Sequence, residues 1–380
     1  MVDAMFNIFI NGLKSKTGGG KSILNNYLSL LKDTKENNQY FVITPNRNEY
    51  EKYRCEHISI IDVNVFYKNN VLFPFVNHFL FPKLLNDLKI DLLFNMGDIV
   101  VPTRIPQLYL FDWAYAIYPE SIAWERMDAI SYLNRRIKLY FFRKYIKCAT
   151  DVIAQTNTAR ERLKSIYGLS NIKIVPNAVS LENLGGGVWK DFNLPVGKTK
   201  LLYLTYYYPH KNLEIFLPLA REIKKKSLPY CLVITIEATQ HKEASRFLEI
   251  VSKENLNDII INTGPVAMAN VPSLYSQCDA LLMPTLLESF SGTYVEAMYH
   301  QKSILTSNID FAKDVCGDAA FYFNPLDADS ILDSLKTCFG DNATRKRRIE
   351  EGKKRLAHLL NWEQAFEKYQ TIIAERLHHS

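Results

Sequence analysis

The sequence contains no Cys-x-x-Cys pair and no long uninterrupted apolar run. Its six cysteines are scattered along 380 residues, and no histidine lies at zinc-ligand spacing from any of them. This distribution favours reduced thiols that act as small buried hydrophobes in a reducing compartment. The most apolar stretch, residues 71–85, is interrupted by Asn77, His78, two prolines and Lys83, so we expect no bilayer-spanning segment.

The excess of positive over negative charge is small, and it is unevenly distributed along the chain. The formal net charge is +6, and residues 1–185 carry all of it, with 23 basic against 17 acidic residues. Residues 126–147 hold seven basic residues and one acid, Asp128, which suits phosphate-rich partners or an anionic membrane surface. The N-terminus carries Asp3 and runs directly into a strand-like segment, unlike a secretory signal, so we expect a cytoplasmic protein.

The remaining composition is that of a globular protein with a core, at 47% hydrophobic and 23% charged residues, and the length favours two domains. Short β-rich runs alternate with helical patterns throughout, which predicts parallel sheets covered on both faces. The alternation stops at Pro176 and at the turn residues 184–187, then restarts near residue 201. We therefore predict domains 1–183 and 184–361, with a last helix at 362–377 returning to the first.

Two such domains are each expected to be Rossmann-like and doubly wound, and to face a central cleft at the carboxyl ends of their sheets. Three motifs follow predicted strands and carry candidate chemistry. The first is Ser15-Lys-Thr-Gly-Gly-Gly-Lys-Ser22, where Gly18 and Gly19 allow backbone amides to approach an anion at a helix start. It resembles a nucleotide-triphosphate loop, but Ser15 replaces the first glycine of that pattern, and a plain turn is the other reading.

The second motif is Pro209-His-Lys-Asn212, preceded by three tyrosines at 206–208. We predict that Lys211 begins a helix, where the helix dipole disfavours a cation. A cation at this place is explained if an anion such as a diphosphate shares the site, and a solvated lysine is the alternative. The tyrosines either line the cleft or pack in the core.

The third motif spans residues 284–298 and reads PTLLESFSGTYVEAM. An apolar strand at 280–283 ends at a proline, a polar loop carries Glu288, and a helix carries Glu296. Free amides at Ser291, Gly292 and Thr293 can cradle phosphate, and loop or first-turn carboxylates can accept hydrogen bonds from sugar or ribose hydroxyls. Two other readings stay open: a capping box between Thr293 and Glu296, and a solvated loop acid at Glu288.

This third motif resembles the E-x7-E signature of retaining glycosyltransferases of the GT-B fold, particularly carbohydrate-active family four. Residues 261–266, 271–275 and 278–280 resemble the run that leads into the signature, and residues 209–212 resemble the phosphate-lysine turn. Residues 151–156 and 173–177 resemble the interdomain approach. The resemblance covers residues 100–325 well and the first hundred more weakly.

The resemblance implies a role for each matching position in a hexosyltransferase. Glu288 would contact the donor sugar, Glu296 the ribose and Lys211 the diphosphate, with Lys16 or Lys21 in support. Gly18 and Gly19 would close over the diphosphate from the first domain. Backbone at Gly264, Pro265 and Val266 would face the base. Amides at Ser291, Gly292 and Thr293 would stabilise the leaving-group charge.

One segment departs from the family pattern. Residues 110–120 resemble a stretch that often reads His-Asp and carries a catalytic histidine, and here Phe111 stands at that place with Asp112 kept. Asp112 is then the natural catalytic candidate beside Glu288. The resemblance implies retention of configuration and no metal or other cofactor. The sequence Asp327-Ala-Asp329 lies late, before a helix, and is expected to cap it.

The expected function is transfer of a hexose-type sugar from a UDP- or GDP-linked donor to a glycan or lipid-linked acceptor, in bacterial-type surface polysaccharide or glycoconjugate synthesis. The basic and aromatic residues of 126–147 would either touch the inner face of the membrane or form a solvated helix with a buried aromatic face. No motif supports nucleic-acid binding. The competing functions are a non-catalytic sugar-nucleotide or glycan binder, and a P-loop ATPase.

Overall fold

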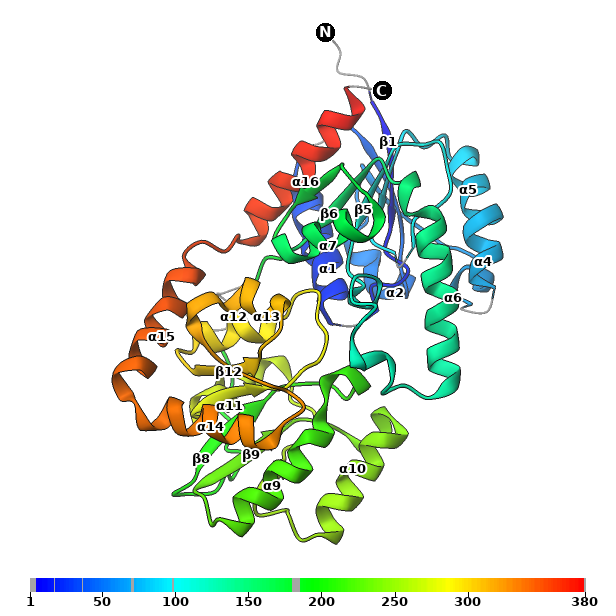
Figure 1. Ribbon diagram of the computed structural model, residues 1–380. Helices are drawn as coiled ribbons and strands as arrows, with labels where there is room; N and C mark the ends of the chain where they lie inside the picture. The colour runs from blue at the N-terminus through cyan, green and yellow to red at the C-terminus, as the bar shows by residue number, and fades with distance from the viewer. Residues whose placement is uncertain are drawn as a thin grey trace. The chain divides into compact units, whose positions relative to one another are not determined.

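The computed structural model describes residues 5–16, 18–35, 37–69, 72–97, 99–179 and 185–378. The chain divides into two compact units (Figure 1). Unit 1 comprises residues 1–117, 128–178 and 360–380, and unit 2 comprises residues 118–127 and 179–359. The predicted boundary between residues 183 and 184 falls outside the described residues. The assignment of residues 118–127 to unit 2 was not predicted.

Unit 1 is built on a parallel sheet, as the alternating pattern predicts. Its central strands are buried on both faces, because helices cover the sheet on either side and leave no room for alternating polar positions. Within the described residues the strand order is β3 (Ile58–Ile61), β2 (Gln39–Ile43), β1 (Asn7–Asn11), β4 (Leu92–Asn95), β5 (Gln107–Leu110), β6 (Asp151–Ala154) and β7 (Ile172–Ile174). The four-residue edge strand β3 was not among the predicted strands.

The longest helices of unit 1 are α1, α6, α7 and α16, and shorter ones fill the loops after β2 and β3. Their bounds are α1 (Gly18–Asp33), α2 (Arg47–Tyr50), α3 (Val65–Lys68), α4 (Phe73–Phe75), the π-helix η2 (Val76–Leu80), α5 (Phe81–Asp87), α6 (Ala129–Tyr145), α7 (Asn157–Tyr167) and α16 (Trp362–Leu377). The predicted bounds of the last helix agree with α16.

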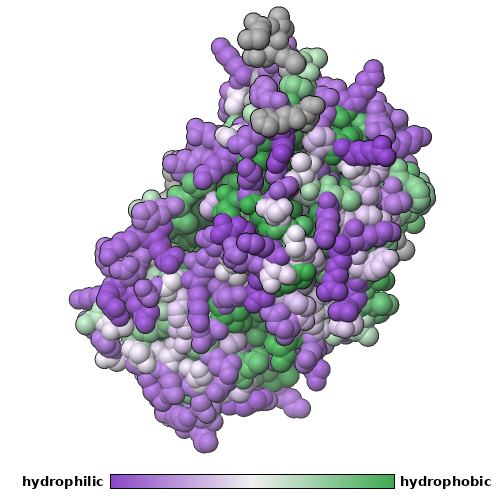
Figure 2. All heavy atoms as spheres, turned by 45° about the horizontal axis from the view of Figure 1, so that its top comes forward, coloured by the Kyte–Doolittle hydropathy of each residue, from purple (hydrophilic) through white to green (hydrophobic). Residues whose placement is uncertain are grey.

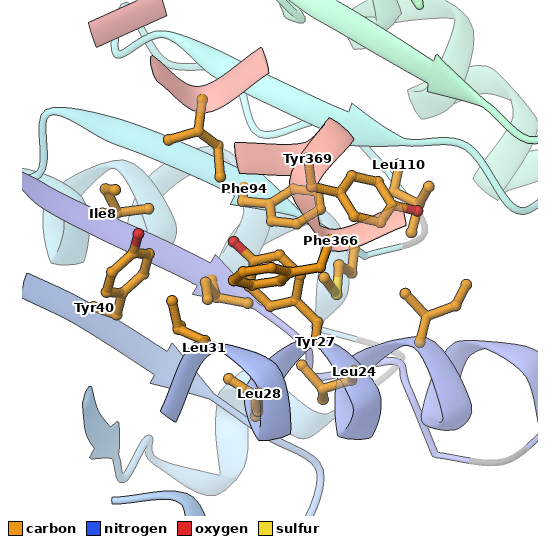
Figure 3. Packing of buried hydrophobic residues seen from close by; sticks show 14 of the residues in the cluster. Ile8, Leu24, Tyr27, Leu28, Leu31, Tyr40, Phe94, Leu110, Phe366 and Tyr369 are labelled. Atoms are coloured by element: carbon orange, nitrogen blue, oxygen red, sulfur yellow. The ribbon is translucent and has the colours of Figure 1, made fainter. Parts of the chain in front are cut away.

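The core of unit 1 joins α1 and α16 to the sheet. Figure 3 shows the α1 side chains directed toward the strands and toward two aromatic rings of α16. The Tyr27 ring packs edge-on against Phe94 of β4, with centroids 5.3 Å apart, and in a tilted arrangement against Phe366 of α16, with centroids 5.2 Å apart. The last segment of the chain is therefore part of the core of the first unit.

Unit 2 repeats the architecture with a second parallel sheet. Within the described residues the order is β10 (Ile260–Asn262), β9 (Tyr230–Ile234), β8 (Thr199–Tyr203), β11 (Ala280–Met283), β12 (Ser303–Ser307) and β13 (Ala320–Phe323). The helices are α9 (Phe216–Lys225), α10 (Lys242–Lys253), α11 (Val271–Gln277), α12 (Gly292–Tyr299), α13 (Asp310–Cys316), α14 (Ala328–Gly340) and α15 (Asn342–Leu356). The sequence did not predict β13.

Two smaller expectations are corrected. Of the predicted linker 184–187, Leu184 lies outside the described residues, but Gly187 packs so tightly in unit 2 that an added Cβ would lie 2.6 Å from the Ala269 carbonyl oxygen. Cys148 is exposed, whereas four other cysteines are buried as expected. No helix among the described residues has both the length and the apolar character needed to cross a bilayer.

Candidate active site

The lysine turn of unit 2 follows β8 and is fixed by its own asparagine. Residues Pro209–Lys211 form a 3₁₀ turn, and Asn212 adopts a left-handed conformation with φ 58°. The Asn212 side-chain amide donates to the carbonyl oxygens of Pro284 (3.1 Å) and Pro325 (2.7 Å). The predicted start of an α-helix at Lys211 is therefore wrong. The left-handed conformation of Asn212 prevents a continuous α-helix here, and α9 begins only at Phe216.

Lys211 and Glu288 meet at the carboxyl ends of neighbouring strands. β8 and β11 pair in the sheet, and the Lys211 ammonium forms an ion pair with the Glu288 carboxylate. The two side chains are only 15% and 12% exposed, so this is a largely desolvated pair rather than a surface contact. The reading of Glu288 as a solvated loop acid is therefore wrong.

Hydrogen bonds to neighbouring segments fix the loop that carries Glu288. The Thr285 side chain is fully buried, and its hydroxyl lies 3.2 Å from the His210 carbonyl oxygen and 3.4 Å from Glu288 Oε1. The Leu286 amide donates to the same His210 carbonyl at 2.8 Å, and Ser307 Oγ donates to the Thr285 carbonyl at 2.6 Å. The acid-bearing loop and the lysine turn are thus one hydrogen-bonded assembly.

The helix after this loop begins two residues earlier than a capping box with Thr293 as N-cap requires. α12 starts at Gly292 with Ser291 as N-cap, and the Ser291 side chain makes no capping bond. Glu296 instead accepts a hydrogen bond from the Tyr275 hydroxyl (3.2 Å). Burial raises the pKa of Glu296, and this hydrogen bond offsets part of the shift. The first amides of α12 have no intrahelical partner, as at any helix N-terminus.

The three tyrosines before the lysine turn divide between the two predicted roles. Tyr207 is buried, hydrogen-bonds to Glu214 and stacks on His241 at 5.4 Å. Tyr206 and Tyr208 are 50% and 39% exposed, with their rings 5.3 Å apart. The backbone is extended here, so alternate side chains point to opposite sides.

The segment expected to face a base follows β10 at the same edge of the sheet. Gly264 has φ 70°, a conformation that favours glycine, and its amide donates a hydrogen bond to Asn262 Oδ1 at 3.2 Å. Pro265 is exposed, and Val266 is half-buried. The role of this backbone stays a prediction.

In unit 1, the glycine turn lies between β1 and α1. Gly18 opens the helix with φ 59°, and no atom lies within 4 Å of a Cβ built on it. Thr17 lies outside the described residues. Lys21 forms a 2.5 Å ion pair with Glu49, with side chains 36% and 39% exposed. Its predicted contribution to a phosphate site would require this pair to open.

A small polar pocket of about 60 Å³ lies at the carboxyl ends of β1, β4 and β5 in unit 1. Asp112 lies at its exposed rim, whereas Phe111 is buried and packs on Phe142 at 5.9 Å. The phenylalanine at the position of the family's histidine is therefore a core residue. The pocket is lined by Lys14, Ser15, Gly20, Met96, Gly97, Tyr109, Leu110, Asp112 and Trp113.

Beneath the pocket, buried amide side chains connect three strands. Asn11 of β1 donates to Asn95 of β4 at 2.9 Å, and Asn95 donates to Gln107 Oε1 of β5 at 2.9 Å. Asn95 Oδ1 also accepts from the Gly97 amide at 2.9 Å, which fixes the loop that lines the pocket. Satisfied buried amides of this kind hold the surrounding backbone in one conformation.

Comparison with known proteins finds a family match within the second unit. Residues 189–355 match the family model described as glycosyl transferases group 1. The match lies within unit 2. Among curated relatives, the O-antigen chain mannosyltransferase RfbU of Salmonella typhimurium is 25% identical over 205 residues, which cover 52% of this chain and 54% of that protein. The serotype-specific mannosyltransferase WbdA of Escherichia coli is 25% identical over 252 residues, which cover 64% of this chain and 29% of the WbdA chain.

Solved structures agree on the fold of this chain. Sucrose-phosphate synthase from Thermosynechococcus elongatus matches with a TM-score of 0.75 at 14% identity, covering 99% of this chain and 100% of that one. HepE of Anabaena, in complex with UDP and glucose, matches with a TM-score of 0.72 at 15% identity, covering 97% and 99%. The predicted GT-B class, with two Rossmann-like domains, is confirmed. By contrast, the chain spans about half or less of the length of the curated relatives above.

Within the group 1 domain, the structure brings together Lys211 and Glu288, on loops that neighbour the start of α12. Gly18, Gly19 and Asp112 belong to the other unit, and their roles stay predictions. Among the described residues, no group of three or more His, Cys, Asp or Glu side chains could hold a metal ion.

Two kinds of residue around the site were not predicted from the sequence. The first kind is a buried tyrosine: the Tyr203 hydroxyl donates to the Lys211 carbonyl oxygen at 3.0 Å, and the Tyr275 hydroxyl donates to the Glu296 carboxylate. The signal for them in the sequence was a hydroxyl group within an otherwise apolar segment. The other is the segment 118–127, where Tyr118 donates to Asp310 at 2.8 Å and Ser121 to the Leu286 carbonyl at 3.4 Å. Nothing local in the sequence indicates these distant contacts.

Proposed function

We propose that this chain transfers a hexose-type sugar from a UDP- or GDP-linked donor to a glycan or lipid-linked acceptor, in the synthesis of a bacterial surface polysaccharide or glycoconjugate. The observation that carries the proposal is the desolvated Lys211–Glu288 pair at the carboxyl edge of the unit 2 sheet. A pair this little exposed costs desolvation free energy that a purely structural role does not require. The relatives named as O-antigen chain and serotype-specific mannosyltransferases support the choice of a surface polysaccharide.

The proposed exchange of partners explains why the two groups lie together. Cleavage of the anomeric bond leaves negative charge on the nucleoside diphosphate. Lys211 would pass from Glu288 to this diphosphate, and the amides of Ser291, Gly292 and Thr293 would share its charge. Glu288, released from the ammonium, would accept hydrogen bonds from the sugar hydroxyls.

The remaining site residues take roles on either side of this centre. Glu296 would accept hydrogen bonds from the ribose hydroxyls, and the backbone of 264–266 would lie against the base. From unit 1, Gly18 and Gly19 would contact the diphosphate, and Asp112 would act on the acceptor side. Retention of configuration and a reaction without metal complete the proposal.

The location follows from the acceptor. A lipid-linked acceptor would be met at the inner face of the cytoplasmic membrane, and the basic segment 126–147 would provide a peripheral contact there. The proposed location is therefore the cytoplasm, with reversible binding to the membrane surface.

The test is nucleotide binding and transfer by the intact chain. UDP or GDP should raise the melting temperature, since a ligand at one hundred times its dissociation constant adds about 2.7 kcal/mol of stability. Lys211→Ala should weaken this shift, and both Lys211→Ala and Glu288→Ala should lower the transfer rate by roughly 10²- to 10³-fold, as loss of a transition-state charge contact does. Melting curves without nucleotide report whether the variants fold.

The control is an ion pair of the same type outside the site. Arg221 and Glu254 form a surface pair in unit 2, at 2.6 Å, and Glu254→Ala should leave nucleotide binding and transfer unchanged. Full transfer by a folded Glu288→Ala variant would contradict the proposal. Donor binding with no turnover in the wild-type protein would instead favour the non-catalytic binder.

A further inference from the structure

Helix α6 is apolar on two faces, only one of which is used by the fold. Its inward face packs on unit 1 through Leu139, Phe142 and Tyr145, all buried. The opposite face carries Ile130, Leu133, Ile137 and Tyr140, which are 74%, 59%, 44% and 61% exposed. Their spacing of three and four residues places them in one stripe along the helix.

The positive charges of α6 are also divided between the two sides. The guanidinium of Arg135 lies over the Tyr115 ring at 5.0 Å, and the ammonium of Lys138 lies over the Trp113 ring at 4.1 Å, so both are engaged within unit 1. Arg136, Lys144 and Lys147 are exposed. Residues 129–147 contain six basic residues and no acid, so nothing on this helix opposes an anionic surface.

A neighbouring element of unit 1 carries a second pair of exposed apolar side chains. Phe75 and Phe79, in α4 and η2, are 54% and 57% exposed, and their rings are 5.3 Å apart. This element is joined to α6 by a 2.8 Å hydrogen bond between the Tyr145 hydroxyl and His78. Figure 2 shows hydrophobic and hydrophilic surface interleaved on the side of unit 1 where α4 to α6 lie in Figure 1.

We propose that the stripe Ile130, Leu133, Ile137 and Tyr140, together with Phe75 and Phe79, is a docking face that inserts into the interface of an anionic lipid bilayer. This inference rests on the proposed peripheral contact and assigns it to particular side chains. An apolar stripe flanked by lysine and arginine, lying along a surface helix, is the pattern of a helix in the plane of a membrane interface. The apolar side chains would enter the acyl boundary while the basic ones meet anionic headgroups.

A bilayer accounts for the whole arrangement better than an acidic protein partner does. Exposed, flexible lysines at a rim contribute little to a protein interface, whose core is depleted in charge. Headgroups of a bilayer, by contrast, are available along the entire length of the helix. The two aromatic rings on the neighbouring element provide a second apolar contact, and stable peripheral binding generally requires two signals.

The experiment is cosedimentation of the full chain with vesicles of phosphatidylcholine alone and of equal parts phosphatidylcholine and phosphatidylglycerol. The wild-type protein should bind the anionic vesicles, with affinity falling as salt rises, and should leave the neutral vesicles largely unbound. Leu133→Ser/Ile137→Ser and Phe75→Ser/Phe79→Ser should each weaken binding by at least about tenfold. Lys144→Gln/Lys147→Gln should weaken it by about fivefold for each charge removed.

Matched control variants lie in unit 2. Val196→Ser/Met268→Ser removes apolar side chains that are 98% and 70% exposed, and Lys346→Gln/Arg347→Gln removes two exposed charges of α15. Neither should change vesicle binding. Failure of the wild-type protein to bind anionic vesicles overturns the proposal. The proposal is also overturned if the control variants lose as much vesicle binding as the docking-face variants do.

The outcome is independent of the proposed enzyme activity. All variants should keep the UDP- or GDP-induced rise in melting temperature, because the substitutions lie outside the nucleotide site. Vesicle binding without a nucleotide response would therefore reject the transferase and keep the docking face. The opposite result would reject the docking face alone.

Discussion

Glu296 has an environment that opposes its charge. Its carboxylate lies in the partly buried space between α11 and α12, where the Tyr275 hydroxyl donates to it. The Tyr275 ring in turn stacks on His300, with centroids 4.8 Å apart. Burial raises the pKa of Glu296 and lowers that of His300, so both groups favour their neutral forms.

The raised pKa of Glu296 predicts a stability that depends on pH. Because the folded state holds this proton more tightly than the unfolded state, the free energy of unfolding falls as pH rises from 4.5 through the raised pKa. It stays reduced above that range. Glu296→Gln should therefore raise the melting temperature near neutral pH and lose this advantage at about pH 4.

The comparison is made by melting curves across pH without nucleotide. Glu254 serves as a control of opposite sign, since its ion pair with Arg221 lowers its pKa. Glu254→Gln should not stabilise the protein at neutral pH. An unchanged melting temperature of Glu296→Gln at every pH would show that the carboxyl is not perturbed. In the proposed function, the same variant should bind nucleotide less tightly, since its amide no longer accepts at both oxygens.

At the scale of elements, α16 is fastened to the sheet of unit 1 by a charge pair as well as by packing. Arg376 pairs through two nitrogens with Asp151, the first residue of β6, and one of these contacts measures 2.8 Å. Asp151 is fully buried and Arg376 is 30% exposed. A second pair on the same helix, Lys173–Glu375, is exposed at 43% and 51%.

Loss of the buried partner should be far more damaging than loss of the exposed one. Arg376→Met removes the cation that pairs with the buried Asp151 carboxylate and should destabilise unit 1 by about 3–5 kcal/mol. Glu375→Gln should change stability by about 1 kcal/mol or less. Urea unfolding of both variants, followed by circular dichroism, measures the difference. Similar small effects of the two substitutions would contradict this account of how α16 is held.

At the scale of the whole molecule, the chain passes between its units more than once. Residues 118–127 leave unit 1 to join unit 2, and residues 360–380 return to unit 1 after unit 2 is complete. Neither unit is therefore a continuous piece of sequence. The large apolar residues of α16, including Trp362, Phe366 and Tyr369, are buried in the first unit.

A chain that ends at residue 359 should lose the fold of unit 1. Each large apolar side chain that α16 buries contributes about 1.5–3 kcal/mol, and together they match the whole stability of a typical domain, about 5–15 kcal/mol. The truncated protein should show rapid proteolysis of unit 1 segments and a lost unfolding transition, while unit 2 segments resist. Two unchanged transitions in the truncated protein would refute the prediction.

Periodicity in the sequence predicted most strands and the last helix, because each of these segments is buried by its own apolar pattern. It missed β3 and β13. The candidate site was found through loop residues such as Glu288, which follow predicted strands. The three tyrosines show the limit of this reasoning: the sequence could not say that Tyr207 packs while Tyr206 and Tyr208 are exposed.

The sequence by itself determined the alternating α/β order and the edge of the sheet at which the polar loops gather, since parallel strands place their carboxyl ends together. Only the tertiary structure decided that Lys211 pairs with Glu288, that Tyr275 rather than a capping contact holds Glu296, and that α6 leaves an apolar stripe uncovered. These depend on side chains that are distant in sequence and meet only when the elements pack. Local patterns carry no information about such partners.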